Sequence, residues 1–319
     1  MEKQIKTIGV LTSGGDAPGM NAAVRAVVRT ACENGIKVYG VIRGYNGLIN
    51  GDLIEMDLRS VSDIITRGGT ILYSARSKEF ATEEGMQKAI ATCKKFGIEG
   101  VVVIGGDGSF RGARDLSERG IPCVGLPGTI DNDIACCDCT IGYDTCLNTI
   151  MSMVDRIRDT TESHDRCSVV EVMGRRAGYI ALGATSILIP EVEFDIEKNI
   201  IERMKKTQQT GKHHFVIIVA EGVDVDVKEL AAQIEAETGV ESRWTILGHT
   251  QRGGSPTVKD RVMATRMGNY AVKLLMQDIG NRVVASHKED IVDYDIFEAL
   301  NMKKSIDMNL YNIAHEVSI

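Results

Sequence analysis

Three short loops of glycine and aspartate carry the strongest chemical signal in this sequence. They are Gly14-Gly-Asp16, Gly105-Gly-Asp-Gly108 and Gly128-Thr-Ile-Asp-Asn-Asp133. Glycines let backbone N–H groups approach phosphate oxygens closely. Carboxylates would repel a phosphate, so they fit better as Mg²⁺ ligands or as a proton acceptor. Phosphate binding, a hard cation and a base together indicate phosphoryl transfer.

Each loop also has a plainer interpretation. Gly14 and Gly15 could form only a tight turn, with Asp16 capping the next helix. The pair Gly106 and Gly108 could be a fragment of a dinucleotide fingerprint, but no full G-x-G-x-x-G motif and no Walker A motif is present. Two carboxylates two residues apart, Asp131 and Asp133, favour function over turn chemistry.

Cationic side chains follow several expected strands. A single arginine is usually a solvated surface residue, and a single histidine is more often structural. Several arginines at strand ends and glycine-rich loops, in a chain of net charge −7, are better interpreted as anion binders. They are Arg76, Arg166, Arg175, Arg243 and Arg252, with His249 beside the last.

The elements that position these loops alternate between strand and helix. Apolar strands are expected at Lys6–Thr12, Gly100–Ile104 and Pro122–Leu126, each directly before one of the loops. Continuous apolar strands between amphipathic helices indicate a parallel sheet covered on both faces. Such sheets bind ligands at the carboxyl ends of their strands, where the loops fall.

The same pattern continues along the chain. A capping-box-like Ser60-x-x-Asp63 predicts a helix over Ser60–Thr66. Further strands are expected at Lys37–Ile42, Ser168–Met173, Ile187–Ile189, Phe215–Ala220 and Trp244–Leu247. Further helices are expected at Ala22–Asn34, Glu83–Phe96, Asp144–Thr160, Ile196–Gln209, Val227–Thr238 and Val258–Gln277.

Composition limits the possible partners. The 319 residues suggest about two domains, and the 33 glycines against 5 prolines suit many tight turns. No apolar run is long enough for a membrane helix, no signal peptide is visible, and the acidic balance disfavours nucleic acid. Four of the eight cysteines lie between Cys136 and Cys146 without a second metal-ligand pair, which favours free thiols in a reducing cytoplasm.

Five segments carry a family resemblance, in family order and over nearly the whole chain. They are Leu11–Asn21, Gly105–Ser109, Pro127–Asp133, Val172–Arg175 and Gly248–Gly254, and they resemble the bacterial ATP-dependent 6-phosphofructokinases. The resemblance implies two Rossmann-like, three-layer α/β/α domains with mainly parallel sheets. Residues 1–142 plus 251–301 would bind ATP, and residues 143–250 plus 302–319 would bind fructose 6-phosphate.

The resemblance also implies roles for individual residues. Asp131 would accept the proton of the sugar 1-hydroxyl, Asp107 and Asp133 would support Mg²⁺, and Thr129, Arg76 and Arg175 would complete the catalytic set. The ATP site would include Gly15, Tyr45, Arg76, Asp107, Gly108, Ser109 and Gly112. The sugar-phosphate site would include Thr129, Asp131, Arg166, Met173, Gly174, Arg175, Glu221, Arg243, His249 and Arg252.

The same resemblance implies regulation and assembly. Arg166 and Arg243 would reach the 6-phosphate held by a neighbouring subunit, so a homotetramer is expected. ADP and phosphoenolpyruvate are expected effectors, at Arg25, Arg29, Arg158, Lys212 and His214. Arg25 and Arg29 could instead be one solvated helix face. Thr210 and Thr185 stand where the family usually has lysine and glutamate.

Two alternatives remain open. Pyrophosphate-dependent relatives typically carry Asp at the position of Gly108 and Lys at that of Gly128, so glycine at both leaves room for ATP. A catalytically weak, nucleotide-sensing subunit is conceivable because about six residues that the family usually has after Leu182 are absent. That gap would shorten the helix after the Met173–Arg175 loop by more than one turn.

Overall fold

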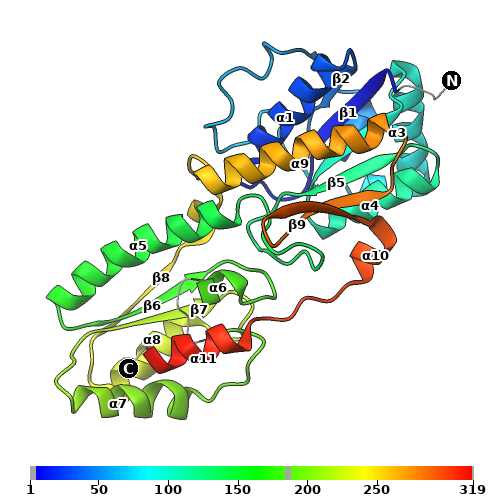
Figure 1. Ribbon diagram of the computed structural model, residues 1–319. Coiled ribbons are helices and arrows are strands. Elements are labelled where there is room, and N and C mark those ends of the chain that lie inside the picture. The colour runs from blue at the N-terminus through cyan, green and yellow to red at the C-terminus, as the bar shows by residue number, and fades with distance from the viewer. Residues whose placement is uncertain (1–4, 184–187, 318–319) are drawn as a thin grey trace. The chain divides into compact units, whose positions relative to one another are not determined.

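The computed structural model describes residues 5–183 and 188–317. The chain forms two compact units (Figure 1). The first comprises Met1–Thr145 with Arg252–Lys304, and the second Cys146–Gln251 with Ser305–Ile319. Among the described residues, no helix is both long and apolar enough to cross a membrane.

The first unit is built on one mixed sheet with a buried parallel centre. Within the described ranges, seven strands pair in the order β10-β9-β5-β4-β1-β2-β3, and only the outermost pairs, β2 with β3 and β9 with β10, are antiparallel. Every residue of β4 is buried, because helices cover both faces of the sheet. The strands are β1 (Thr7–Thr12), β2 (Lys37–Val41), β3 (Leu53–Met56), β4 (Gly100–Gly105), β5 (Cys123–Pro127), β9 (Arg282–His287) and β10 (Asp290–Asp295).

Helices pack on both faces of this sheet (Figure 1). Gly268 of α9 lies against Ala23 and Ala26 of α1, where a Cβ would come within 2.8 Å of either residue, so these two helices pack closely. On the other face, the Phe110 ring of α4 covers Gly125 of β5. The helices are α1 (Met20–Glu33), α2 (Tyr45–Asn50), α3 (Glu83–Phe96), α4 (Asp107–Glu118), α9 (Val258–Met276) and α10 (Ile296–Asn301), with a 3₁₀ turn at Glu79–Ala81.

The second unit has a smaller parallel sheet. In the part of the chain that is described, its strands pair in the order β7-β6-β8, with β6 (Cys167–Val172) between β7 (Phe215–Ala220) and β8 (Ser242–Ile246). Helix α8 packs on β6 and β8, and α6 packs on β7. The helices are α5 (Tyr143–Ser163, whose first turn belongs to the first unit), α6 (Tyr179–Gly183), α7 (Glu202–Gln208), α8 (Val227–Thr238) and α11 (Met308–Val317), with a π-helical turn at Glu197–Ile201 and a 3₁₀ turn at Gly248–Arg252.

The mainly parallel α/β class is therefore confirmed, with local exceptions. The helix expected over Ser60–Thr66 is wrong, because this segment forms turns. The Asp57 carboxylate accepts hydrogen bonds from the backbone N–H groups of Arg59 and Ser60 and from the Ser60 hydroxyl. These local bonds compete with helix formation. Asp63 also has a positive φ of 57°, which a helix does not allow.

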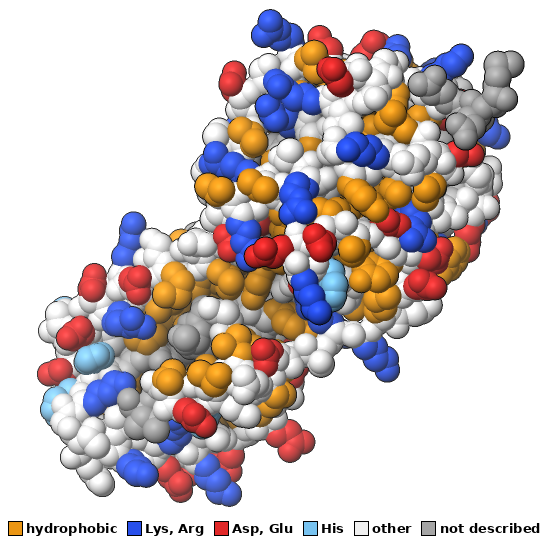
Figure 2. All heavy atoms as spheres, viewed as in Figure 1, with side chains coloured by type: hydrophobic (Ala, Val, Ile, Leu, Met, Phe, Trp, Pro, Cys, Tyr) orange, Lys and Arg blue, Asp and Glu red, His pale blue; other side chains and the backbone are white. Residues whose placement is uncertain are grey.

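Two further expectations are altered. The expected strand Ile187–Ile189 falls partly outside the described residues, and Leu188 makes only a single bridge to Val219. The helix expected over Ile196–Gln209 begins as a π-helical turn before continuing as α7. On the face drawn in Figure 2, acidic and basic side chains are interspersed over both units.

Candidate functional site

The first glycine loop follows β1 and packs under an arginine. Gly14 has a φ of +86°, and a Cβ on Gly15 would come within 2.5 Å of the Arg252 guanidinium. Arg252 Nη1 donates to the carbonyl oxygen of Asp16 at 3.1 Å. The Gly14 N–H donates to Ala75 O at 3.4 Å, so the exposed Arg76 lies beside the same loop. One predicted anion-binding arginine, Arg252, thus contacts the first loop, and a second, Arg76, directly follows a residue bonded to it.

The second loop begins helix α4, where a helix N-terminus attracts anions. Gly106 precedes the helix in an extended conformation, and Asp107 is its first residue. Asp107 pairs with Arg111 Nε one turn later at 2.9 Å. Gly108 is exposed, and a Cβ there would meet no atom within 4 Å. The space in front of Gly108 is therefore open to a ligand.

Two predicted ATP-site residues, Tyr45 and Gly112, pack against each other beneath the start of α4. Tyr45 is 4% exposed, and its hydroxyl donates to Ser109 O at 2.6 Å. The Tyr45 ring stacks on the Phe80 ring, with 3.9 Å between the ring centroids. A Cβ on Gly112 would come within 2.8 Å of the Tyr45 ring. Burial raises the pKa of Tyr45 well above its ordinary value. In this structure Tyr45 and Gly112 position the first turn of α4.

The third loop holds the candidate base. Asp131 is 3% exposed, and its backbone N–H donates to Thr129 Oγ1 at 3.2 Å. Asn132 is left-handed, with φ 53°, and its side-chain oxygen accepts from Thr140 N at 3.1 Å. The Thr140 hydroxyl donates to Thr129 O at 2.6 Å. These bonds fold the loop back on residues 138–141 and hold the backbone on both sides of Asp131.

Strand register brings the second and third loops together. Gly105 at the end of β4 pairs with Pro127 at the end of β5, and Gly128 N donates to Gly105 O at 3.0 Å. A Cβ on Gly106 would lie 3.9 Å from Thr129 Cβ. The start of α4 and the aspartate loop therefore emerge side by side at the carboxyl edge of the sheet, as the spacing predicts.

In the second unit, the Met173–Arg175 loop follows β6. Glu221, directly after β7, accepts from the backbone N–H of Gly174 at 3.2 Å and of Arg175 at 2.5 Å. The Met173 N–H donates to the side-chain oxygen of Gln251 at 3.1 Å. Gly174 and Arg175 both have positive φ, of 147° and 57°. Two side-chain acceptors, Glu221 and Gln251, thus fix the backbone of this loop.

Charge and burial also affect a neighbouring carboxyl. The pKa of Glu171 on β6 is raised mainly by burial and to a smaller extent by the negative charge of Glu221. The backbone carbonyl of the same residue accepts from Leu247 N at 3.1 Å, which ties β6 to the start of the predicted His249 loop. His249 itself is exposed.

Two predicted substrate arginines lie at the other end of this sheet. Arg166 Nε pairs with a Glu241 oxygen at 2.9 Å, and Arg243 pairs with the other oxygen of the same carboxylate. Both arginines adjoin the amino ends of β6 and β8, whereas Met173 follows the carboxyl end of β6. The six residues of β6 span about 20 Å. Within this chain, Arg166 and Arg243 therefore lie away from the Met173 loop.

The predicted effector residues occupy both units. Arg25 and Arg29 lie one turn apart on α1, and burial and the charge of Arg29 lower the pKa of Arg25. In the second unit, Arg158 lies on α5 and pairs weakly with Asp155 at 3.7 Å. Lys212 and His214 precede β7, with the Lys212 ammonium 5.7 Å from the Phe215 ring. Thr185 lies outside the described residues.

In the cysteine-rich segment, Cys136 and Cys137 are buried and Cys139 is half-buried. Burial raises the pKa of Cys136 and of Cys139 to about 12. Cys137 Sγ lies 3.3 Å from the Ser286 hydroxyl. Across residues 5–183 and 188–317, no three His, Cys, Asp or Glu side chains cluster as a metal site.

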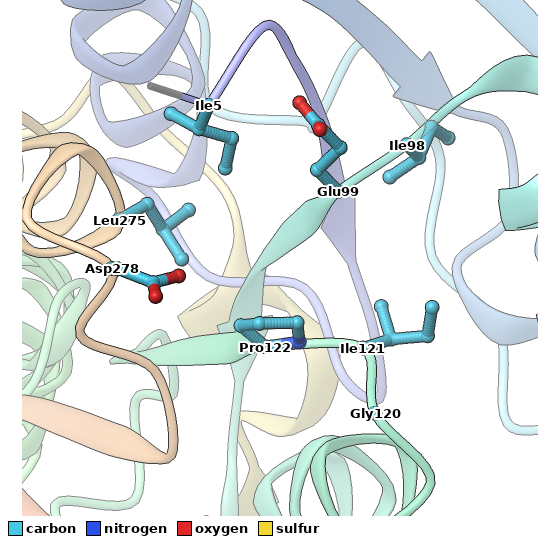
Figure 3. A pocket seen from close by; sticks show the side chains of 8 residues that line it. All are labelled: Ile5, Ile98, Glu99, Gly120, Ile121, Pro122, Leu275 and Asp278. Carbon is cyan, nitrogen blue, oxygen red and sulfur yellow. The ribbon is translucent and has the colours of Figure 1, made fainter. Parts of the chain in front are cut away.

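A separate pocket of about 250 Å³ lies at the amino ends of the strands of the first sheet (Figure 3). Ile98 and Glu99 precede β4, and Ile121 and Pro122 precede β5, so the pocket lies at the amino ends of these strands. The Glu99 carboxylate accepts from the Lys6 N–H at 2.6 Å. Ligands of such sheets bind at the carboxyl ends instead, so this pocket is remote from the candidate chemistry.

Sequence reasoning assigned no role to three polar residues that hold the loops. Gln251 accepts the Met173 N–H, Asn132 bonds to residues 138–140, and Lys304 donates to Asn132 O at 2.8 Å. Gln251 and Asn132 lie inside the quoted motifs, so their positions offered a signal. Lys304 lies 172 positions from its acceptor, and nothing local marks it.

Comparison with known proteins gives one consistent result. The family model described as "Phosphofructokinase" matches residues 7–275. The chain is 56% identical over 321 residues to the ATP-dependent 6-phosphofructokinase of Bacillus pumilus, covering 99% of this chain and 100% of that protein. It is 57% identical over 316 residues to that of Clostridium botulinum (strain Loch Maree), covering 97% and 98%. The phosphofructokinase structure from Saccharomyces cerevisiae superposes with a TM-score of 0.88 at 35% identity, over 98% of this chain and 48% of that longer one.

Proposed function

The chain belongs to the phosphofructokinase family, and we propose that it transfers the γ-phosphoryl group of ATP to the 1-hydroxyl of fructose 6-phosphate. The products are ADP and fructose 1,6-bisphosphate. This reaction is the committed step of glycolysis. The enzyme is a phosphotransferase, and its two substrates are ATP and fructose 6-phosphate.

One observation carries the assignment of roles. The anion-attracting start of α4 and the loop bearing Asp131 emerge side by side, because Gly105 pairs with Pro127. A phosphoryl donor bound at Gly106–Ser109 would therefore lie next to a buried carboxylate. We assign ATP to the larger unit and fructose 6-phosphate to the smaller one.

The proposed step is an in-line displacement. The sugar O1 forms a bond to the γ-phosphorus while the bond from that phosphorus to the β,γ-bridging oxygen breaks. The proton of the 1-hydroxyl moves to the Asp131 carboxylate, and ADP leaves with the bond's electron pair. Such a loose transition state needs alignment and charge stabilisation more than covalent help.

Two arginines would stabilise the transferring charge. Arg76 stands beside the Gly14 loop, and Arg175 stands on the loop that Glu221 and Gln251 hold. Thr129, whose hydroxyl accepts the Asp131 N–H, keeps the base in place. Glu221, Met173, Gly174, His249 and Arg252 would bind the sugar phosphate.

The carboxylates present suit a metal-assisted reaction with Mg²⁺. Mg²⁺ is usually held by one or two carboxylates together with substrate phosphates and water. Asp107 begins α4, two residues after β4, and Asp133 lies on the loop that follows the neighbouring strand β5, so the two supply that number. When bound, the cation would neutralise charge on the β- and γ-phosphates.

We further propose a homotetramer in which subunits share sites. Arg166 and Arg243 lie a strand length from the Met173 loop of their own subunit, which supports their use by a neighbour. Allosteric control by ADP and phosphoenolpyruvate is supported by two adjacent guanidinium groups, Arg25 and Arg29, whose mutual repulsion an anion would relieve. No disulfide joins the cysteines of the described residues, which suits a cytoplasmic enzyme.

A coupled assay tests the proposed function. Fructose 6-phosphate and Mg²⁺ are supplied with either ATP or pyrophosphate, and fructose 1,6-bisphosphate formation is followed. We expect turnover with ATP and none with pyrophosphate. Turnover only with pyrophosphate would show that pyrophosphate, and not ATP, is the phosphoryl donor. No turnover with either donor would support a regulatory subunit.

A further inference from the structure

Lys304 reaches from the end of the first unit into the aspartate loop. It follows α10 and is the last residue before the chain enters the second unit. Its ammonium donates to Asn132 O at 2.8 Å and to Cys137 O at 2.7 Å. One side chain therefore joins two turns of the segment between β5 and α5.

The first of these contacts sets a specific peptide plane. Asn132 is 5% exposed and left-handed, a conformation that asparagine adopts more readily than most residues with a side chain. Its carbonyl belongs to the peptide that leads directly to Asp133. Because Lys304 holds that carbonyl oxygen, it fixes how the peptide between Asn132 and Asp133 is turned.

The second contact ties the loop to the sheet. Asp138 N donates to Ser286 O at 2.9 Å, and Cys139 N donates to the Ser286 hydroxyl at 3.1 Å. Ser286 belongs to β9, so the turn at Cys137 is anchored on a strand. Lys304 extends this anchor to Asn132, which lies between the two candidate carboxylates.

We propose that Lys304 is a positioning residue for phosphoryl transfer. Through its hydrogen bonds to Asn132 O and Cys137 O, it holds the loop that carries Asp131 and Asp133 in the orientation needed for the reaction. This inference rests on the proposed function. Charge-assisted hydrogen bonds are about twice as strong as neutral ones, so an ammonium suits two convergent carbonyl groups. No substrate contact is required of Lys304.

Three variants test this role. Lys304→Met keeps the aliphatic stem and removes the ammonium, Lys304→Arg restores a cationic donor, and Lys303→Met is the matched control at the exposed neighbouring lysine. For each, kcat, the KM of both substrates and the Mg²⁺ concentration at half-maximal rate are measured. Hydrogen–deuterium exchange of residues 128–140 is measured on the same folded samples.

A misplaced catalytic group costs rate more than ground-state binding. We expect K304M to lower kcat about tenfold to a hundredfold. It should also raise the Mg²⁺ requirement and speed exchange across residues 128–140, with both KM values changing less than about threefold. K304R should recover most of the rate, and K303M should match the parent.

Other outcomes overturn the proposal. A kcat and a Mg²⁺ requirement within twofold of the parent would do so, as would a loss of folded protein with unchanged kcat per folded molecule. If the parent itself shows no turnover, the proposed function fails. Hydrogen–deuterium exchange then decides separately whether Lys304 holds the loop. Unchanged exchange of residues 128–140 in K304M would show that it does not. Should K304M not fold, Lys304→Gln, which is shorter and neutral, takes its place.

Discussion

The carboxylate of Glu221 accepts a hydrogen bond from the backbone N–H of Arg175 at 2.5 Å. The same oxygen accepts from Gly174 N at 3.2 Å, so one side chain holds two successive peptides in positive-φ conformations. The loop that presents the Arg175 guanidinium is thus shaped from outside by the end of the neighbouring strand.

Removing this acceptor should loosen the loop. We expect Glu221→Ala to raise the KM for fructose 6-phosphate severalfold and to lower the free energy of unfolding by about 1 kcal/mol. Glu221→Gln, which keeps an acceptor oxygen, should have a smaller effect. Steady-state kinetics and urea unfolding check both, with Glu229→Ala on the exposed face of α8 as the control. Equal effects of the Ala and Gln variants would show that the charge, and not the hydrogen bond, matters.

The raised pKa of Glu171 predicts a pH dependence of stability. Because burial and the charge of Glu221 raise its pKa in the folded state, the folded protein binds this proton more tightly than the unfolded chain. The contribution of Glu171 to stability is therefore present at pH values below its unfolded pKa and is lost as pH rises through its folded pKa.

The variant Glu171→Gln removes that titration. We expect it to be more stable than the parent at pH 7, with the difference shrinking as the pH approaches 4. Thermal unfolding across pH 4 to 8 measures this. A stability difference that does not change with pH would contradict the assigned cause.

The open space before Gly108 makes a prediction about the donor. A carboxylate introduced there by Gly108→Asp would face the phosphates of ATP. Like-charge repulsion should lower kcat/KM for ATP about tenfold to a hundredfold. Gly69→Asp serves as the control, because a Cβ at Gly69 also meets no atom within 4 Å. An unchanged kcat/KM for ATP would place the nucleotide elsewhere.

Shared sites predict complementation between inactive variants. Arg243→Ala keeps Asp131, and Asp131→Ser keeps Arg243, so each symmetric pair that contains one chain of each variant regains one of its two sites. Random mixing at equal amounts should recover roughly a quarter of the parent activity. The two variants are dissociated, mixed and reassembled before assay. Activity equal to the sum of the separate variants would indicate that each site is complete within one subunit.

Local signals predicted much of the fold. The helices at Glu83–Phe96 and Val227–Thr238 have the expected bounds, because the Asp226 cap and the left-handed Gly97 and Gly239 are encoded within a few residues of the ends. The helix predicted over Ser60–Thr66 is absent because the Asp57 side chain accepts the backbone N–H groups of Arg59 and Ser60. The antiparallel β9–β10 pair was not expected, since no periodic signal marked it.

The candidate loops were predictable because glycine and aspartate spacing is visible in one stretch of chain. Their supports were not. Gln251 acts on Met173 across 78 positions, Lys304 acts on Asn132 across 172, and Arg166 shares Glu241 with Arg243 only because β6 and β8 are neighbours. Tyr45, which the resemblance places at the nucleotide, packs under α4 with its ring against Phe80 and Gly112, and no local pattern predicted that packing.

The most direct measurement compares Asp131→Ser with the parent in ATP, fructose 6-phosphate and Mg²⁺, with products followed by phosphorus NMR. The parent should form ADP and fructose 1,6-bisphosphate in equal amounts. The variant should be slower by about 10²-fold to 10⁴-fold in kcat while still binding the sugar phosphate in calorimetry, because a general base is lost and the binding groups remain. An unchanged kcat in the variant, or a parent that releases phosphate only to water, would contradict the account.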